Sequence, residues 1–96
     1  MAMPAGIMRI DLRLPGNRSL KGKRQITQRL KAMLRRRFNL SVAELDCQDL
    51  HQRCVMGVSA VSSSHDVIEN EMRKVLQFLD SQRDCQVIER EIEYIP

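Results

Sequence analysis

Aromatic residues are scarce in this 96-residue sequence, which has two phenylalanines, one tyrosine and no tryptophan. Proteins that read single-stranded RNA stack unpaired bases on aromatic side chains. Both phenylalanines fall in or beside predicted helices, and Tyr94 is predicted to point inward. The aromatic platform of an RNA-recognition motif is therefore excluded, and any recognition of nucleic acid should depend on shape and charge.

Cysteines and long apolar runs are also few. Three cysteines, Cys47, Cys54 and Cys85, cannot all pair within one chain, and the N-terminus lacks the pattern of a secretion signal. We therefore expect reduced thiols and a cytoplasmic location. No stretch approaches the roughly 18 apolar residues of a membrane span, so no membrane association is expected. Without repeats, linkers or low-complexity segments, residues 1–96 are predicted to form a single domain.

Acidic residues are nearly missing from one part of the chain. Residues 9–37 carry eleven lysines and arginines against a single acid, Asp11, for a charge of +10, whereas residues 38–96 carry −6. Such a division creates a directional electrostatic field that attracts a polyanion to one side of the molecule. It can also orient self-association.

The basic stretch 19–38 has the pattern of an amphipathic helix. One predicted face is apolar and consists of Ile26, Leu30, Met33, Leu34 and Phe38. The opposite predicted face is polar and consists of Lys21, Arg24, Gln28, Lys31 and Arg35. Ser19 is the expected N-cap, with Asn17 as a competing candidate, and Asn39 is expected to close the helix.

Regularly spaced cations on a rigid helix can follow a phosphate backbone and release counterions as they bind. The sequence therefore predicts a nucleic-acid-binding site, with structured RNA favoured, made of Lys21, Lys23, Arg24, Lys31, Arg35 and Arg36. Two other interpretations stay open at this stage. Arg35 to Arg37 also oppose the negative end of the helix dipole, and the whole face can be solvated or contact a protein.

The helix start offers a weaker phosphate site. Residues 16–24 differ from a nucleotide-binding loop because five residues separate the glycines and Arg24 replaces the magnesium-binding hydroxyl. Backbone N–H groups beside Lys21, Lys23 and Arg24 remain candidates for binding one phosphate of a larger ligand. A solvated helix start is the alternative.

The other elements complete a β-α-β-β-α-β order. Strands are predicted at 7–14, 40–45, 54–62 and 87–95, and a second helix begins after the serines at 62–64. Ser63 and Asp66 are expected to form its capping box. The apolar stripe predicted for this helix consists of Ile68, Met72, Val75, Leu76 and Leu79. With right-handed crossovers, this order predicts an α+β, ferredoxin-like fold: a four-stranded antiparallel sheet with both helices on one face.

The other face of the predicted sheet is open. Because the first strand should lie beside the last, Arg9 and Arg13 are expected opposite Glu89, Glu91 and Glu93 in a ladder of charge pairs. The strand at 54–62 is predicted to be central. Val55 and Val61 are expected near the middle of the open face, so the alternative function is a homodimeric or adaptor domain that binds protein through this face.

The segment 46–54 contains five potential metal ligands, namely Asp46, Cys47, Asp49, His51 and Cys54. The spacing Cys47-x3-His51-x2-Cys54 supplies only three ligands, whereas structural zinc sites usually need four. No partner marks a Cys-His nucleophile either. We therefore predict no metal, no cofactor and no enzymatic activity.

Several short strings make the chain similar to a known family. These are Leu14-Pro15-Gly16, Ser19-Leu20-Lys21, Lys23-Arg24, the run Arg37-Phe38-Asn39-Leu40-Ser41-Val42-Ala43-Glu44, Gln48-Asp49-Leu50 and Gln52-Arg53. Over residues 7–94 the chain resembles the YlxP-like family of small bacterial proteins, a domain of unknown function. The resemblance implies a ferredoxin-like fold and genes that often lie among those for translation and ribosome maturation, and it implies no enzymatic activity.

Overall fold

Four strands and two helices follow one another in the predicted β-α-β-β-α-β order in the computed structural model, which describes residues 3–46 and 50–95. The elements are β1 (Ala5–Arg13), α1 (Leu20–Arg37), β2 (Ser41–Asp46), β3 (Arg53–Val61), α2 (His65–Asp80) and β4 (Gln86–Ile95). The strands form one antiparallel sheet in the order β2-β3-β1-β4. The ferredoxin-like prediction is confirmed, as is the central position of β3.

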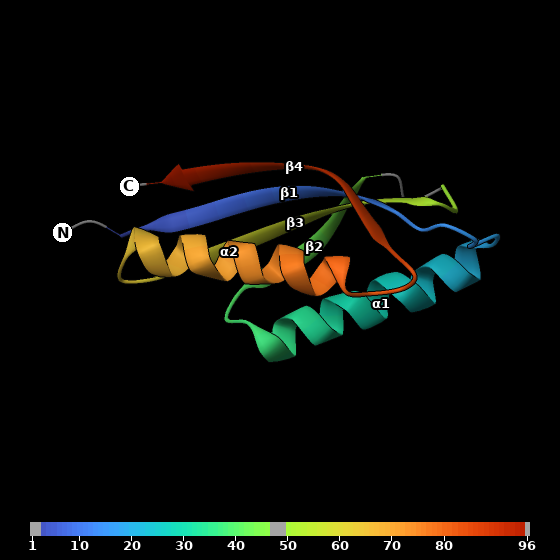
Figure 1. Ribbon diagram of the computed structural model, residues 1–96, viewed down its shortest axis with the longest axis horizontal. Helices are drawn as coiled ribbons and strands as arrows, with labels where there is room; N and C mark the ends of the chain where they lie inside the picture. Colours follow the sequence, from blue (N-terminus) through green and yellow to red (C-terminus); the bar gives the residue numbers. More distant parts are fainter. Residues whose placement is uncertain (1–2, 47–49, 96) are drawn as a thin grey trace.

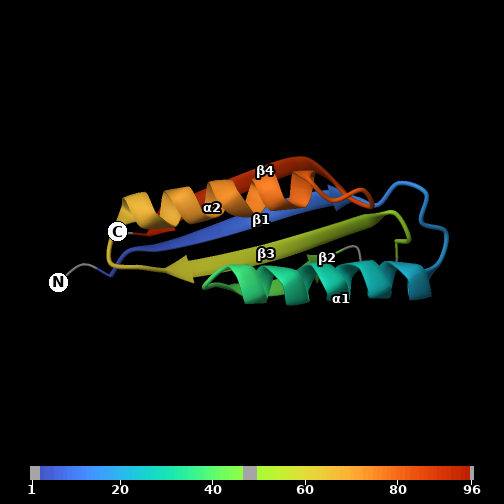
Figure 2. The same ribbon diagram turned by 60° about the horizontal axis from the view of Figure 1, so that its bottom comes forward.

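Both helices cover the same face of the sheet (Figure 1). They run along it side by side, with α1 next to β2 and α2 next to β1 and β4 (Figure 2). The opposite face carries no helix, as the sequence predicted. The strands β2 and β4 form the two edges of the sheet.

The core lies between the helices and the sheet. Alternation along β1 continues to Leu14 and buries Met8, Ile10, Leu12 and Leu14 completely. Each fully buried side chain of this size contributes about 1.5–3 kcal/mol relative to exposure. The predicted stripe of α2 is also buried, with Phe78 added to it. Period-2 and period-3.6 patterns therefore placed most of the core correctly.

The buried face of α1 differs from the prediction. Leu30 and Leu34 are fully buried, but Ile26 and Met33 are only half-buried. Lys23 and Thr27 take up the remaining positions of the buried stripe. The helix is thus rotated from the expected orientation, so that the series 23, 27, 30 and 34 faces the sheet.

The ends of the helices confirm one expectation and correct two. Ser19 caps α1, since its Oγ accepts the N–H of Gly22 at 2.9 Å. The helix ends at Arg37 and is followed by Phe38 in an extended conformation, so Asn39 does not close it. In α2 the cap is Ser64, whose Oγ accepts the N–H of Val67 at 3.2 Å. The predicted Ser63–Asp66 capping box is therefore wrong by one residue.

The edge strand β4 is more exposed than expected. Its register with β1 shifts between Asp11 and Leu12, and Leu12 pairs with Val87. As a consequence Val87, and not Ile88, packs against the core. Tyr94 lies on the helix-covered side and stacks on His65, with ring centroids 6.4 Å apart. The inward direction that the sequence predicted is therefore confirmed, although the residue stays 38% exposed.

Candidate nucleic-acid interface

One flank of α1 presents a row of cations to solvent. We call Lys21, Arg24, Lys31, Arg35 and Arg36 the basic flank. With the neutral Gln28 between Arg24 and Lys31, the first four follow one side of the helix at spacings of three, four, three and four residues. Lys31 is half-buried and the other four are exposed. Within residues 3–46 and 50–95, none of these five cations forms an ion pair with a carboxylate.

The basic flank borders β2. A guanidinium N–H of Arg35 donates to the carbonyl oxygen of Val42 at 2.9 Å. A neutral acceptor fixes the side chain without cancelling its charge, and the remaining N–H groups of the guanidinium still point elsewhere. A groove of about 340 Å³ lies between α1 and β2, lined in part by Arg24, Gln28, Lys31 and Glu44. The cations therefore line one side of a surface groove.

Lys23 does not belong to this flank. It is only 2% exposed, and its ammonium lies 3.3 Å from Oε2 of Glu44 on β2. This contact lacks hydrogen-bond geometry, so it is electrostatic. Sequence analysis grouped Lys23 with the nucleic-acid contacts because it neighbours Lys21 and Arg24 in the chain. Although Lys23 lines the groove between α1 and β2, its 2% exposure and the nearby Glu44 carboxylate leave its ammonium little access to a phosphate.

Two further arginines of α1 have partners on the other side of the helix. Arg29 contacts Asp84 in an ion pair of 2.5 Å, and it donates to the side-chain oxygen of Gln82 at 3.2 Å. The guanidinium of Arg37 lies 4.8 Å from the centre of the Phe78 ring, a cation–π geometry. The charge of α1 is therefore divided between structural contacts and the basic flank.

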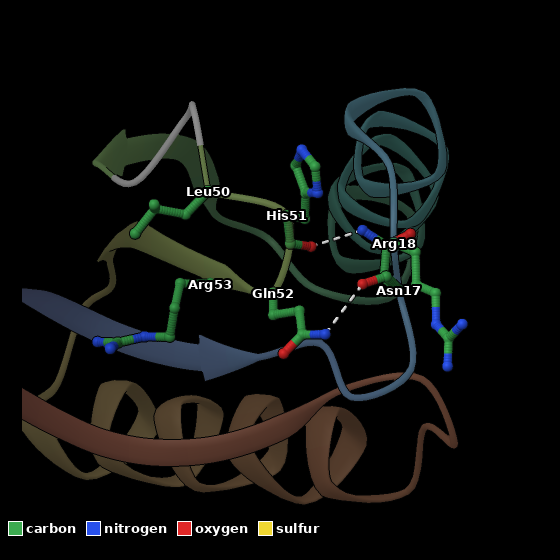
Figure 3. Close-up of a pocket in the computed structure, with 6 residues that line it drawn as sticks. All are labelled: Asn17, Arg18, Leu50, His51, Gln52 and Arg53. Atoms are coloured by element: carbon green, nitrogen blue, oxygen red, sulfur yellow. Dashed lines mark hydrogen bonds between the residues drawn. The ribbon is translucent and has the colours of Figure 1, made fainter.

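A second hollow, of about 560 Å³, lies beside the start of α1, where the loop after β1 meets the chain leading into β3 (Figure 3). The side-chain N–H₂ group of Asn17 donates to the carbonyl of His51, and that of Gln52 donates to the carbonyl of Asn17 at 3.2 Å. These bonds tie the helix start to the hairpin. Asn17 thus braces the loop while Ser19 supplies the cap.

Arg18 lines the same hollow but points away from His51 (Figure 3). It is exposed and lies three residues before Lys21. It therefore adds a cation at the N-terminal end of the basic flank. The helical repeat does not indicate Arg18, because this residue precedes the helix. Its position directly before the N-cap is the signal that identifies it.

The cysteines that the structure describes are buried. Burial, and next the neighbouring carboxylate of Glu44, raises the pKa of the Cys54 thiol to about 12. Burial likewise raises the pKa of Cys85 to about 11, with Asp84 as a smaller cause. Both thiols are protonated at neutral pH, whereas a nucleophile or a metal ligand must be a thiolate. Neither side chain is placed for thiol chemistry.

The metal-ligand candidates of the hairpin are scattered or lie outside the described residues. Cys47 and Asp49 belong to the undescribed segment 47–49, His51 is exposed, and Cys54 is buried in the core cluster. Among residues 3–46 and 50–95, no three histidine, cysteine or carboxylate side chains come close enough to share a metal ion. In the same part of the chain no helix has the length and apolar character needed to cross a membrane.

Comparison with known proteins places the chain in a family. Residues 5–92 match the model of a family described as "Protein of unknown function (DUF503)". The chain belongs to the DUF503 family. A DUF503 relative, uncharacterized protein YlxP of Bacillus subtilis (strain 168), is 43% identical over 63 residues, which cover 66% of this chain and 68% of the relative. The resemblance to YlxP-like proteins is thus confirmed, and the function of the family is unknown.

Proposed function

We propose that this DUF503 protein is a non-enzymatic module that binds structured RNA, alone or within the ribosome, through the basic flank of α1. The observation that carries the proposal is that all five cations of the basic flank lack a carboxylate partner in the described chain. No carboxylate of residues 3–46 and 50–95 therefore neutralises their charge. The proposed contacts are Lys21, Arg24, Lys31, Arg35 and Arg36, and Lys23 is left out because it is buried.

The dimensions of the helix suit a polyanion. Lys21 and Arg35 lie fourteen residues apart, which corresponds to about 21 Å along a helix axis. A rod of this length can contact several successive phosphates, and structured RNA is recognised mostly by shape and by contacts to phosphate and 2′-hydroxyl groups. The acidic residues of β4 lie on the far edge of the sheet from β2, so they do not oppose a polyanion on this flank (Figure 1).

The test is the salt dependence of RNA binding. Affinity for an RNA hairpin should be measured by fluorescence anisotropy at about 50 mM and about 200 mM salt. Release of counterions from four or five phosphates predicts a loss of affinity on the order of a hundredfold between these conditions. Affinity that does not change with salt, or no binding at the lower salt concentration, would reject the proposal.

A second candidate function, self-association through the open face of the sheet, is favoured by its exposed apolar side chains. Ile7, Leu45 and Val61 are exposed there, Val61 by 68%. Leu45 packs on Gly57 beside a shallow groove of about 260 Å³. Val55, which the sequence placed near the centre of this face, is only 1% exposed and does not contribute. The candidate partner is a second copy of the chain, since an exposed apolar patch is often a dimer surface.

Light scattering on Val61→Asp would test this candidate. If the open face joins two copies, the wild type should have twice the mass of a monomer, and the charged variant should be monomeric because it buries an unpaired carboxylate. Val67→Asp is the matched control, because Val67 is also exposed but lies on α2. A monomeric wild type at micromolar concentration would exclude the candidate.

A further inference from the structure

The edge strand β4 has one long side without a partner strand. Nine of its ten residues pair with β1 on one side, and β4 ends the sheet on the other. Figures 1 and 2 show that α2 lies under the sheet and does not close this edge. An open edge presents a row of backbone N–H and C=O groups that can pair with another extended chain. The other edge, β2, is shorter, has six residues and an irregular register, and borders α1.

The open-face side of β4 is a row of carboxylates. Glu89, Glu91 and Glu93 pair in register with Asp11, Arg9 and Ile7 of β1, whose side chains lie on the face without helices. All three glutamates are exposed, and none forms an ion pair within the described part of the chain. The sequence predicted charge pairs between β1 and β4. The two strands are neighbours, but no salt bridge joins them in the described chain. This leaves the three carboxylates available to an added strand.

The helix-covered side of β4 carries apolar residues that are incompletely covered, and one cation, Arg90, which pairs in register with Ile10. Ile92 pairs in register with the buried Met8, and Tyr94 pairs with Gly6, so both point to the side of α2. They nevertheless remain 37% and 38% exposed. The edge thus carries acidic residues on one face, and on the other face two half-covered apolar residues with the exposed Arg90 beside them.

A second copy of β4 does not fit this edge. Antiparallel pairing of two identical strands about a two-fold axis joins residues that lie on the same face. With Glu91 at the axis, Glu89 of each copy lies opposite Glu93 of the other. Like charges directly opposite one another destabilise a strand pair, so the edge resists self-pairing. The same row of charges favours a strand of opposite charge.

We propose that β4 binds an extended segment of a partner protein in which lysine or arginine alternates with aliphatic residues. The segment would extend the sheet by one strand through backbone hydrogen bonds, a recurring mode of peptide recognition. Its cations would lie opposite Glu89, Glu91 and Glu93, and its aliphatic side chains would cover Ile92 and Tyr94. The charge pairs give this site its preference, because an acidic or uncharged segment gains nothing from the glutamate row.

This site is independent of the proposed RNA site. The basic flank borders β2 at one edge of the sheet, and β4 forms the opposite edge. An occupied β4 therefore leaves α1 accessible, and the two bindings should add without competition. Failure of either one leaves the other unaffected.

The experiment uses a fluorescent peptide of about nine residues in which lysine and valine alternate, titrated against the full chain at moderate salt. We expect saturable binding, together with slower hydrogen exchange at backbone amides within residues 86–95. Two peptides serve as controls: a glutamate–valine peptide of equal length, and the lysine–valine peptide with every backbone nitrogen methylated, which keeps its charge but cannot donate backbone hydrogen bonds. Both should bind much more weakly.

Protein variants locate the site. Glu89→Lys with Glu93→Lys should weaken binding of the lysine–valine peptide by roughly tenfold, because two attractive cross-strand pairs become repulsive. Glu69→Lys with Asp80→Lys changes the net charge equally at exposed positions of α2 and should change affinity by less than about twofold. Circular dichroism would confirm that both variants are folded.

Three results would overturn the proposal. The first is that the lysine–valine peptide does not bind. The second is equal binding of the methylated peptide, which would show a charge contact without strand addition. The third is an equal loss of affinity in the two charge variants, which would place the contact away from β4.

Discussion

Lys23→Met should lower the free energy of unfolding by about 3 kcal/mol. The ammonium of Lys23 lies 3.3 Å from the Glu44 carboxylate, and both side chains are largely buried, with 3% and 18% of their surface exposed. Removing the cation leaves a mostly buried negative charge that loses its nearest compensation. The Cys54 thiol, which neighbours Glu44, remains as a much weaker partner. Urea unfolding followed by circular dichroism measures the change.

Replacing both members of the pair should restore most of that stability. Apolar side chains of similar volume need no charge compensation, so Lys23→Met with Glu44→Leu should differ from the wild type by no more than about 1 kcal/mol. The net charge of the double variant equals that of the wild type. A single variant as stable as the wild type would show that the pair contributes nothing, and a double variant less stable than the single would contradict the compensation argument.

The same double variant distinguishes a structural lysine from an RNA contact. Lys23 lies on the buried side of α1. The folded double variant should therefore bind the RNA hairpin with wild-type affinity and the same salt dependence. The sequence-based assignment of Lys23 to the contacts expects a weaker affinity and a smaller salt slope. This measurement therefore decides which description of Lys23 is right.

Lys21→Glu with Arg24→Glu should weaken RNA binding on the order of a hundredfold at low salt. The two changes remove two phosphate contacts and add two repulsive charges at one end of the basic flank. Neither side chain is used in the fold: both are exposed and neither forms an ion pair in the described chain. The first turn of α1 contains no acidic residue at present. Carboxylates there interact favourably with the helix dipole, so stability should be kept or slightly raised.

The matched control is Lys74→Glu with Arg83→Glu. These exposed cations lie in α2 and in the turn that follows it, away from the basic flank, and their reversal changes the net charge by the same amount. The control should lose less than about tenfold in affinity, from the long-range field alone. Anisotropy titrations of wild type and both variants at one low salt concentration make the comparison. Equal losses in both variants would mean that RNA responds to net charge and that the basic flank has no special role.

Much of the fold could be predicted because its signals are local. The periods of strand and helix determine which side chains share a face. The alternating residues from Met8 to Leu14 and the stripe from Ile68 to Leu79 share such faces, and both sets are buried. Ser19 capped α1 as expected because its side chain reaches an N–H only three residues away. The strand order then followed from general rules for connections in sheets.

The errors share a physical cause. The capping box at Ser63 and the closure at Asn39 depended on the exact place where a helix begins or ends, and the face of β4 that reaches the core depended on where the strand shifts register. Neighbouring residues compete for such positions with small differences in free energy, and contacts made on packing select among them. Val87 faces the core in place of Ile88 because β4 shifts its register against β1, and nothing within β4 itself indicates that shift.

By itself, then, the sequence determined the order of elements, the ferredoxin-like topology, the two main apolar stripes and the concentration of positive charge in the first third of the chain. Only the tertiary structure decided which of those charges face water. The rotation of α1 depends on how Leu30 and Leu34 fit the sheet and on Glu44, twenty-one positions after Lys23, which supplies the carboxylate that allows Lys23 to be buried. Helical spacing defines the faces of a helix, but packing against distant residues determines which face is buried.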